Sequence, residues 1–147
     1  MKVHRSADRG SAILEFLIIG VLVLVPLLYV VITVLRVESA VMASTQAVRE
    51  AGRAFMMADS ASQGRRNAQT AARLALSDQG FELPATALSI TCADICLSPS
   101  SSTRVRLQWR VDLPWIPSTL GGQDLGYPIT VDSELRIDSY RSDADEL

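Results

Sequence analysis

The sequence predicts an α+β protein in which a long N-terminal transmembrane helix extends into a small head with a second helix and a three-stranded antiparallel sheet. Three observations predict this layout. Residues 16–35 carry no formal charge, residues 40–58 repeat alanine at a helical period, and residues 104–113 alternate polar and apolar side chains. We expect five segments: a basic leader (1–10), the transmembrane helix (11–36), an extracytoplasmic helical region (37–80), a β-sheet head (81–140) and an acidic flexible tail (141–147).

Residues 16–35 are the expected membrane span. Sixteen of these twenty residues are Leu, Ile, Val or Phe, and as a helix they extend about 30 Å, the thickness of the hydrocarbon core. Their summed insertion free energy outweighs the cost of one Glu near the helix end. A cleaved secretory signal is the alternative, with Ala43 before Ser44 as a cleavage site, but signal cores are usually only ~7–15 residues long.

The flanking charges predict the orientation of the span. Lys2, Arg5 and Arg9 outnumber Asp8 on the N-terminal side, whereas Arg36 and Glu38 nearly cancel on the other side. Because positive residues stay in the cytoplasm, we expect a cytoplasmic N-terminus and an extracytoplasmic C-terminus. We therefore expect a single-pass membrane protein.

The helix is expected to continue beyond the bilayer, from about Ala12 to Ala58. Small side chains recur there at steps of three and four residues, and such a stripe lets another element approach closely. The stripe could pack against another subunit or against the chain's own head, and the second interpretation is favoured. Its members are Ala40, Ala43, Ala47, Ala51, Ala54 and Ala58.

The remaining elements follow from breaks and alternation. Residues 59–64 contain capping residues, residues 63–77 have a second helical pattern, and Gln79-Gly80 followed by Pro84 ends it. Strict alternation then predicts strands at 104–113 and 129–138, preceded by a weaker strand at 86–92. Loops rich in Pro, Gly and Ser between them predict an antiparallel meander.

Composition argues against several classes of function. The chain after residue 10 has eleven Arg and fifteen Asp or Glu, a net charge of 11 − 15 = −4, which disfavours nucleic acid as a partner. The one histidine, His4, lies in the leader. No nucleophile–base pair and no phosphate-binding glycine loop occurs, so we expect neither an enzyme nor a bound metal or cofactor.

The two cysteines, Cys92 and Cys96, lie four positions apart. Outside the cytoplasm a structural disulfide is the first interpretation, ahead of free thiols and of a metal site, which needs further ligands. Pro26 lies inside the span, where it removes a backbone donor and predicts a kink or a loosened turn. That proline is either simply tolerated or part of a helix that bends on leaving the lipid.

The leader and the start of the span together form a motif, Arg-Gly-Ser-Ala-Ile-Leu-Glu-Phe, at residues 9–16. It resembles the processing site of type IV prepilins and pseudopilins. With the Ala-rich run after the span, it is most similar to TadE-like proteins of the tight-adherence (Flp pilus) machinery. The departures, Ile13-Leu14 and Leu17-Ile18-Ile19, are conservative.

The resemblance implies a minor pilin or an assembly component with a pilin-like fold. A prepilin peptidase would cut between Gly10 and Ser11 on the cytoplasmic side. Glu15 and Phe16 would then serve assembly, because the Glu15 carboxylate meets the new amine of a neighbouring subunit. The implied partners are the membrane, the peptidase, other pilin-like subunits and membrane platform proteins of the pilus machinery.

Physical chemistry agrees with these implied roles. A cut after Gly10 would give Ser11 a positive amine, and Glu15 would lie one helical turn away near the positive end of the helix dipole. A carboxylate at the edge of the hydrocarbon is costly without such a partner. The alternative function is an uncleaved single-pass protein whose head binds a cell-surface partner.

Overall fold

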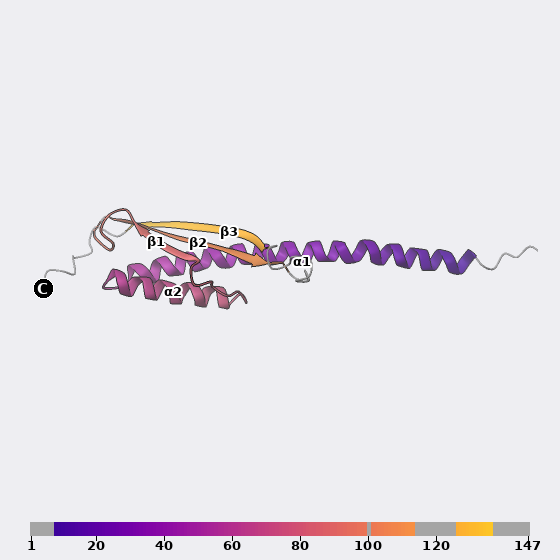
Figure 1. Cartoon of the computed structure of the whole chain (residues 1–147), viewed down its shortest axis with the longest axis horizontal. Coiled ribbons are helices and arrows are strands. Elements are labelled where there is room, and N and C mark those ends of the chain that lie inside the picture. Colours follow the sequence, from indigo (N-terminus) through magenta and orange to yellow (C-terminus); the bar gives the residue numbers. More distant parts are fainter. Residues whose placement is uncertain (1–7, 100, 114–125, 137–147) are drawn as a thin grey trace, which may run out of the picture. The chain divides into compact units, whose positions relative to one another are not determined.

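The computed structural model describes residues 8–99, 101–113 and 126–136. The chain divides into two compact units, residues 1–36 and residues 37–147. Residues 1–7 of the predicted leader and the whole predicted tail, 141–147, lie outside the described residues. The predicted α+β layout is confirmed (Figure 1), and its elements are α1 (Asp8–Met56), α2 (Ala61–Ser77), β1 (Leu88–Cys92), β2 (Ser102–Asp112) and β3 (Gly126–Arg136).

Helix α1 is 49 residues long and continues without interruption through Pro26. It starts at Asp8, before the expected Ala12, and ends at Met56, before the expected Ala58. The long uninterrupted helix is therefore confirmed. The proline does not end it, since the missing Pro26 N–H removes only the hydrogen bond to the Leu22 carbonyl four residues earlier.

Helix α2 has a side-chain cap at one end and a backbone cap at the other. Ser60 is the N-cap, and its hydroxyl accepts a hydrogen bond from the Gln63 amide at 3.4 Å, so the helix begins at Ala61 and not at 63. At the other end Gly80 has φ of +76°. The Gly80 and Phe81 amides donate to the Ser77 and Leu76 carbonyls, which is the Schellman arrangement and confirms the predicted end.

The three strands form the predicted antiparallel meander in the order β1-β2-β3. Val105 of β2 lies between Ile90 of β1 and Ser133 of β3. Strand β3 begins at Gly126, three residues before the predicted start, because its pairing with β2 extends to Asp112. On the outer face Arg104 and Glu134 form an ion pair at 3.2 Å, and both side chains are about half exposed. Such an exposed pair contributes little to stability.

In the second unit, α2 and the C-terminal part of α1 lie on one face of the sheet (Figure 1). The small-residue stripe of α1 is buried there by the chain's own head: Ala40, Ala43, Ala47 and Ala51 are at most 1 % exposed. The favoured interpretation of the stripe is therefore the one observed. Val48 and Phe55 are fully buried beside it, whereas Val41, on the same predicted line, is 40 % exposed.

Glycine and alanine permit close contacts between these layers. A Cβ added at Gly52 of α1 would lie 2.5 Å from Leu135 of β3. A Cβ at Gly64 of α2 would lie 2.8 Å from the Phe55 ring and 3.0 Å from the Phe55 carbonyl oxygen. A larger residue at Gly52 would require the Leu135 side chain to move, whereas one at Gly64 would also press against the backbone of α1 and push the two helices apart.

One partly buried hydrogen bond links the sheet to α1. The Trp109 indole N–H of β2 donates to the Ser44 hydroxyl at 2.9 Å, and that hydroxyl donates to the Ala40 carbonyl at 2.6 Å. The Phe81 ring packs edge-on against Trp109, with the ring centroids 5.5 Å apart. Trp109 thus packs its half-buried ring against the core and still satisfies its only donor.

Replacing Ser44 with alanine tests this link. Ser44→Ala leaves the half-buried Trp109 N–H without its acceptor, which we expect to lower the free energy of unfolding by about 1 kcal/mol. Thr45→Ala is the matched control. The Thr45 hydroxyl also donates to the carbonyl four residues earlier but does not bond the sheet, so little change is expected. Urea unfolding of the full chain in micelles, followed by circular dichroism, measures the free energy of unfolding of the two variants. Equal losses of stability in Ser44→Ala and Thr45→Ala would contradict a stabilising role of the Trp109–Ser44 hydrogen bond.

Candidate functional site

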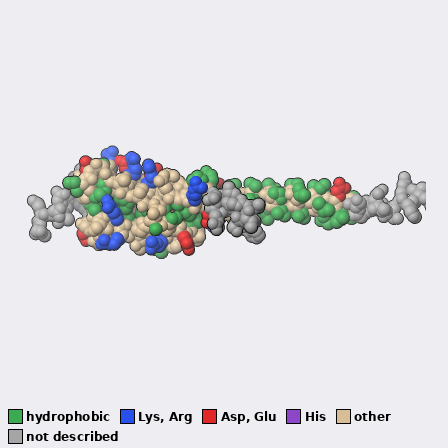
Figure 2. Space-filling view, viewed as in Figure 1, with side chains coloured by type: hydrophobic (Ala, Val, Ile, Leu, Met, Phe, Trp, Pro, Cys, Tyr) green, Lys and Arg blue, Asp and Glu red, His purple; other side chains and the backbone are tan. Residues whose placement is uncertain are grey.

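The first unit presents apolar side chains on all sides of α1. Eighteen large apolar residues between Ile13 and Leu35 are 45–76 % exposed, and hydrophobic side chains cover the visible face of this part of the helix (Figure 2). One helix, within Ala12–Met56, is long and apolar enough to cross a membrane, and its most apolar stretch is not buried by the protein. So much exposed apolar surface is stable only against lipid or another protein.

The predicted cleavage position lies in the first turn of α1. The backbone of Gly10 and Ser11 is helical, and the helix begins only two residues earlier, at Asp8. Glycine is a poor helix former. The chain around the Gly10–Ser11 bond can therefore unwind at low cost, as a protease that binds an extended substrate requires.

Glu15 lies on α1 four residues after Ser11, which is one helical turn. Its side chain is exposed, and Phe16 beside it is 76 % exposed. From Glu15 to Leu35 no other residue carries a formal charge, and the next cation along the chain is Arg36. Any cation that pairs with Glu15 must therefore come from the N-terminal side or from another molecule.

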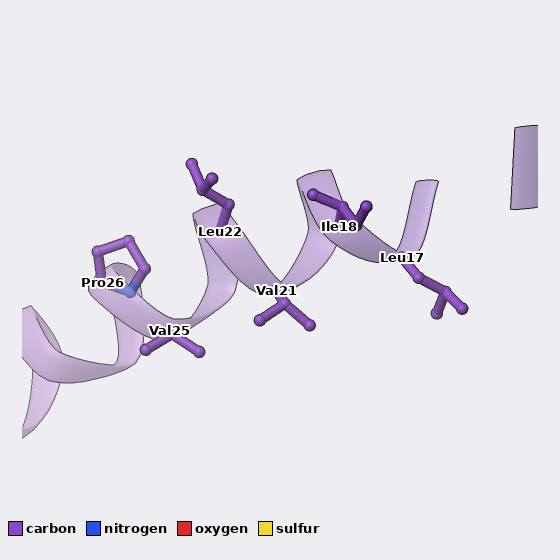
Figure 3. A pocket seen from close by; sticks show the side chains of 6 residues that line it. All are labelled: Leu17, Ile18, Val21, Leu22, Val25 and Pro26. Atoms are coloured by element: carbon purple, nitrogen blue, oxygen red, sulfur yellow. The ribbon is translucent and has the colours of Figure 1, made fainter. Parts of the chain in front are cut away.

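A shallow groove follows one side of the helix between two rows of side chains (Figure 3). Leu17, Val21 and Val25 form one row, and Ile18, Leu22 and Pro26 form the other. Rows at a spacing of four residues are the ridges between which another helix can pack. No polar side chain lines the groove, so it lacks the groups that orient a small polar ligand.

The cysteines lie at the far end of the second unit from Val37, in the connection between β1 and β2. Cys92 and Cys96 are joined by a disulfide, and both pack against the core. The Thr103 hydroxyl donates to the Cys92 sulfur at 3.9 Å. Ile95, between the two cysteines, is 80 % exposed, and Leu97, the residue after Cys96, has φ of +68°. The disulfide therefore holds together the two ends of an exposed loop.

No cluster of three or more metal-ligating side chains occurs among residues 8–99, 101–113 and 126–136. The expectation that the protein is not an enzyme remains a prediction. The expected absence of a bound metal also remains a prediction.

Comparisons with protein-family models, with curated proteins and with solved structures find no match for this chain.

The structure separates the predicted site residues into two groups. Gly10, Ser11, Glu15, Phe16 and Pro26 all lie on α1 in the first unit. Cys92 and Cys96 lie in the second unit. The disulfide is therefore a feature of the second unit, whereas the residues predicted to serve processing and assembly all lie on α1.

Sequence reasoning missed Ser44 as the residue that binds Trp109. The signal was present, since Ser44 interrupts an alanine stripe at a buried position and Trp109 was predicted to face the core. A buried indole needs an acceptor for its N–H. Gly52 and Gly64 were also missed, although small residues within helical patterns often mark a close approach of two elements.

Loss of the disulfide gives a test for the head. Replacing both Cys92 and Cys96 with serine is expected to lower the free energy of unfolding by about 2 kcal/mol or less, since the closed loop is very short. Dithiothreitol should lower the stability of the wild type by a similar amount and leave the double variant unchanged. Urea unfolding in micelles measures the free energy of unfolding of the wild type and the double variant, each with and without dithiothreitol. If dithiothreitol also lowers the stability of the double variant, its effect on the wild type does not come from the Cys92–Cys96 disulfide.

Proposed function

We propose that this chain is a minor pilin-like subunit, or an assembly component, of a tight-adherence (Flp-type) pilus. In this proposal a prepilin peptidase removes the leader by cutting after Gly10. The single observation that carries the proposal is the position of Glu15: a carboxylate five residues after Gly10, at the start of the part of α1 that is otherwise apolar on every side. The mature chain would have a pilin-like fold.

The physical argument begins with the cost of Glu15. An unpaired carboxylate at the edge of the hydrocarbon costs several kcal/mol on helix-insertion scales, or it forces a local distortion of the bilayer. Leu and Val residues at this position would insert more easily. Glu15 therefore requires a partner, and the nearest possible cation on the same helix face is an amine at Ser11, which exists only after cleavage.

The proposed assembly step uses the same amine and carboxylate between subunits. The amine on one subunit and Glu15 on another would neutralise each other inside the lipid and fix the relative height of the two helices. The exposed rows of side chains on residues 17–26 supply apolar surface for this contact. Removal of Lys2, Arg5 and Arg9 with the leader would lower the cost of drawing the helix out of the membrane.

The fold restricts the surfaces that could contact other subunits in this proposal. The alanine stripe on residues 40–51 is occupied by the chain's own head, so it cannot at the same time bind a neighbouring subunit. Assembly contacts would therefore lie on the apolar first unit or on the outer surface of the head. The proposed location is the inner membrane, with residues 1–10 cytoplasmic and the head extracytoplasmic, before entry into a pilus.

The cleavage step is tested on the substrate residue. In cells with an active peptidase, Gly10→Leu should retain the ten-residue leader, whereas the wild type and the control Gly20→Leu should begin at Ser11. Gly20 is a suitable control because a side chain there would meet no other atom. Intact-protein mass spectrometry measures the three chains. A wild-type chain that keeps its leader would contradict the proposal and favour the uncleaved alternative.

The assembly role is tested on the carboxylate. Glu15→Ala should leave the protein level and cleavage unchanged but reduce the number of pili per cell at least about tenfold, as expected for loss of an interaction worth ~1.4 kcal/mol or more. Glu38→Ala removes a carboxylate of the same helix beyond the span and should not affect pili. Electron microscopy counts the pili. Normal counts in Glu15→Ala cells would favour a head that binds a surface partner.

A further inference from the structure

We propose that the free edge of β3 is a docking site for an extended, basic segment of another protein, which binds there as a fourth strand of the sheet. Strand β3 has eleven residues and lies at one edge of the sheet, where β2 is its only strand partner among the described residues (Figure 1). The opposite edge is formed by β1, which has five residues and lies against α2. The inference concerns the second unit alone and does not depend on the proposed pilin-like function.

Two backbone hydrogen bonds beside β1 show which groups of β2 point to each side. The Gln108 amide donates to the Ala87 carbonyl, and the Ser102 carbonyl accepts from the Ala93 amide. Successive residues of a strand direct their backbone groups to opposite sides, so the even-numbered residues of β2 bond toward β1. The odd-numbered residues of β2 therefore bond toward β3.

The register transfers this alternation to β3. Val105 lies opposite Ser133, and Leu107 lies opposite Val131. Opposite residues whose backbone groups face each other exchange their hydrogen bonds, so the odd-numbered residues of β3 are already paired with β2. The backbone groups of the even-numbered residues point away from β2, toward the free edge. From residue 130 onward these outward amides belong to Thr130, Asp132, Glu134 and Arg136.

Pro128 agrees with this assignment. It is an even-numbered residue of β3 and lies opposite Arg110, so its nitrogen faces the free edge. Proline has no N–H, and within sheets it occurs mainly where its nitrogen does not have to bond a neighbouring strand. The same residue limits the site, because a partner strand can obtain amide donors only from residue 130 onward.

The side chains beside this edge select the charge of the partner. Asp132 and Glu134 are exposed on the outer face of the sheet. Glu134 pairs with Arg104 through one carboxylate oxygen, Oε2, whereas Asp132, opposite Arg106, makes no ion pair within the described part of the chain. An added strand would place its own side chains opposite these carboxylates, where Arg or Lys is favourable and Asp or Glu is not.

The same charges disfavour a second copy of β3 as the partner. Two β3 edges would pair antiparallel, with even-numbered residues opposite even-numbered residues. Registers centred on Asp132, Ser133 or Glu134 overlap residues 130–136 most, and each of them places an acidic side chain opposite another. Like charges directly opposite each other destabilise a pair of strands, so the edge rejects its own copy and accepts a basic strand.

The inner side of the edge adds apolar surface. Val131 and Leu135 are partly buried and pack against the core. Because side chains alternate along a strand, a partner with Arg or Lys on the outer face would place its other residues next to these two. Strand β2 itself has such an alternation, with Arg104 and Arg106 on either side of Val105. The partner is therefore a segment in which basic and apolar residues alternate.

A synthetic peptide with the sequence of residues 103–108, Thr-Arg-Val-Arg-Leu-Gln, is the probe, since β2 already pairs antiparallel with β3. The full chain is held in micelles of a zwitterionic detergent, and NMR follows the hydrogen exchange of its backbone amides. In the free chain the amides of Val131 and Ser133 should exchange slowly, whereas those of Asp132 and Glu134 should exchange rapidly. Saturating peptide should slow exchange at 132 and 134 at least about threefold and leave 131 and 133 unchanged.

Substitutions at the edge separate the backbone contribution from the charge contribution. Thr130→Pro removes one outward N–H and should weaken peptide binding at least about threefold, whereas the control Thr130→Val keeps that N–H and should bind like the wild type. Asp132→Asn combined with Glu134→Gln should also weaken binding about threefold or more, and a peptide with Glu in place of both Arg should not bind. Fluorescence anisotropy of labelled peptide measures the affinities, and circular dichroism checks that each variant is folded.

Several results would overturn the docking site. Slow exchange at 132 and 134 in the free chain would show that the edge is already covered, and protection that rises with protein concentration would identify a second copy as the occupant. No binding at millimolar peptide, or binding that leaves exchange at 132 and 134 unchanged, would exclude strand addition. None of these results bears on cleavage after Gly10, so the proposed function would stand.

Discussion

A single uninterrupted helix, α1, has to be stable in two different surroundings, and this constraint governs the rest of the structure. Its first part is apolar on every side and is not buried by the protein. Its second part has one buried stripe of small residues and a polar opposite side. The change from one pattern to the other occurs between Leu35 and Ala40, within about one and a half turns. Helix α2 and the sheet share one hydrophobic core with this second part.

Small residues make that packing possible. Alanines at positions 40, 43, 47 and 51 let the helix backbone approach the other layers, and Gly52 and Gly64 permit the closest contacts. Large side chains then fill the core from the other elements, above all Leu76, Val105 and Leu107. Because the sheet has only three strands, it depends on both helices to cover its apolar face. The Trp109–Ser44 bond fixes the register of this packing.

Local pattern was sufficient to predict the elements, because burial imposes a period on each of them. Alternation at residues 104–113 predicted β2, and the alanine period predicted the helix after the span. Boundaries shifted by up to four residues, since caps such as Ser60 and pairing partners such as Asp112 determine the ends. Contacts distant in sequence could not be predicted, for periodicity identifies a buried face but not what covers it. Ser44 is the clearest case.

The residues of the candidate site were predicted from their chemistry, whereas the helices and strands were predicted from periodicity. Gly10 is a flexible residue before the expected span, and Glu15 is a charged residue directly before the uncharged stretch. The structure adds that both lie on one helix and that the alanine stripe is already occupied, which restricts assembly contacts to other surfaces. Pro26 remains within continuous helix, so any role in bending requires a force that acts during extraction from the membrane.

The most direct test of the account is whether Glu15 acts through the amine that cleavage creates. A double-mutant cycle of Gly10→Leu and Glu15→Ala provides it, with co-purification of other pilin-like subunits from solubilised membranes as the measurement. If the two groups form one pair, adding Glu15→Ala to the Gly10→Leu chain should cause no further loss of co-purified subunits. If instead each substitution reduces the co-purified subunits by its own factor and the two factors multiply in the double variant, Glu15 does not act through the new amine. That result would contradict the central claim.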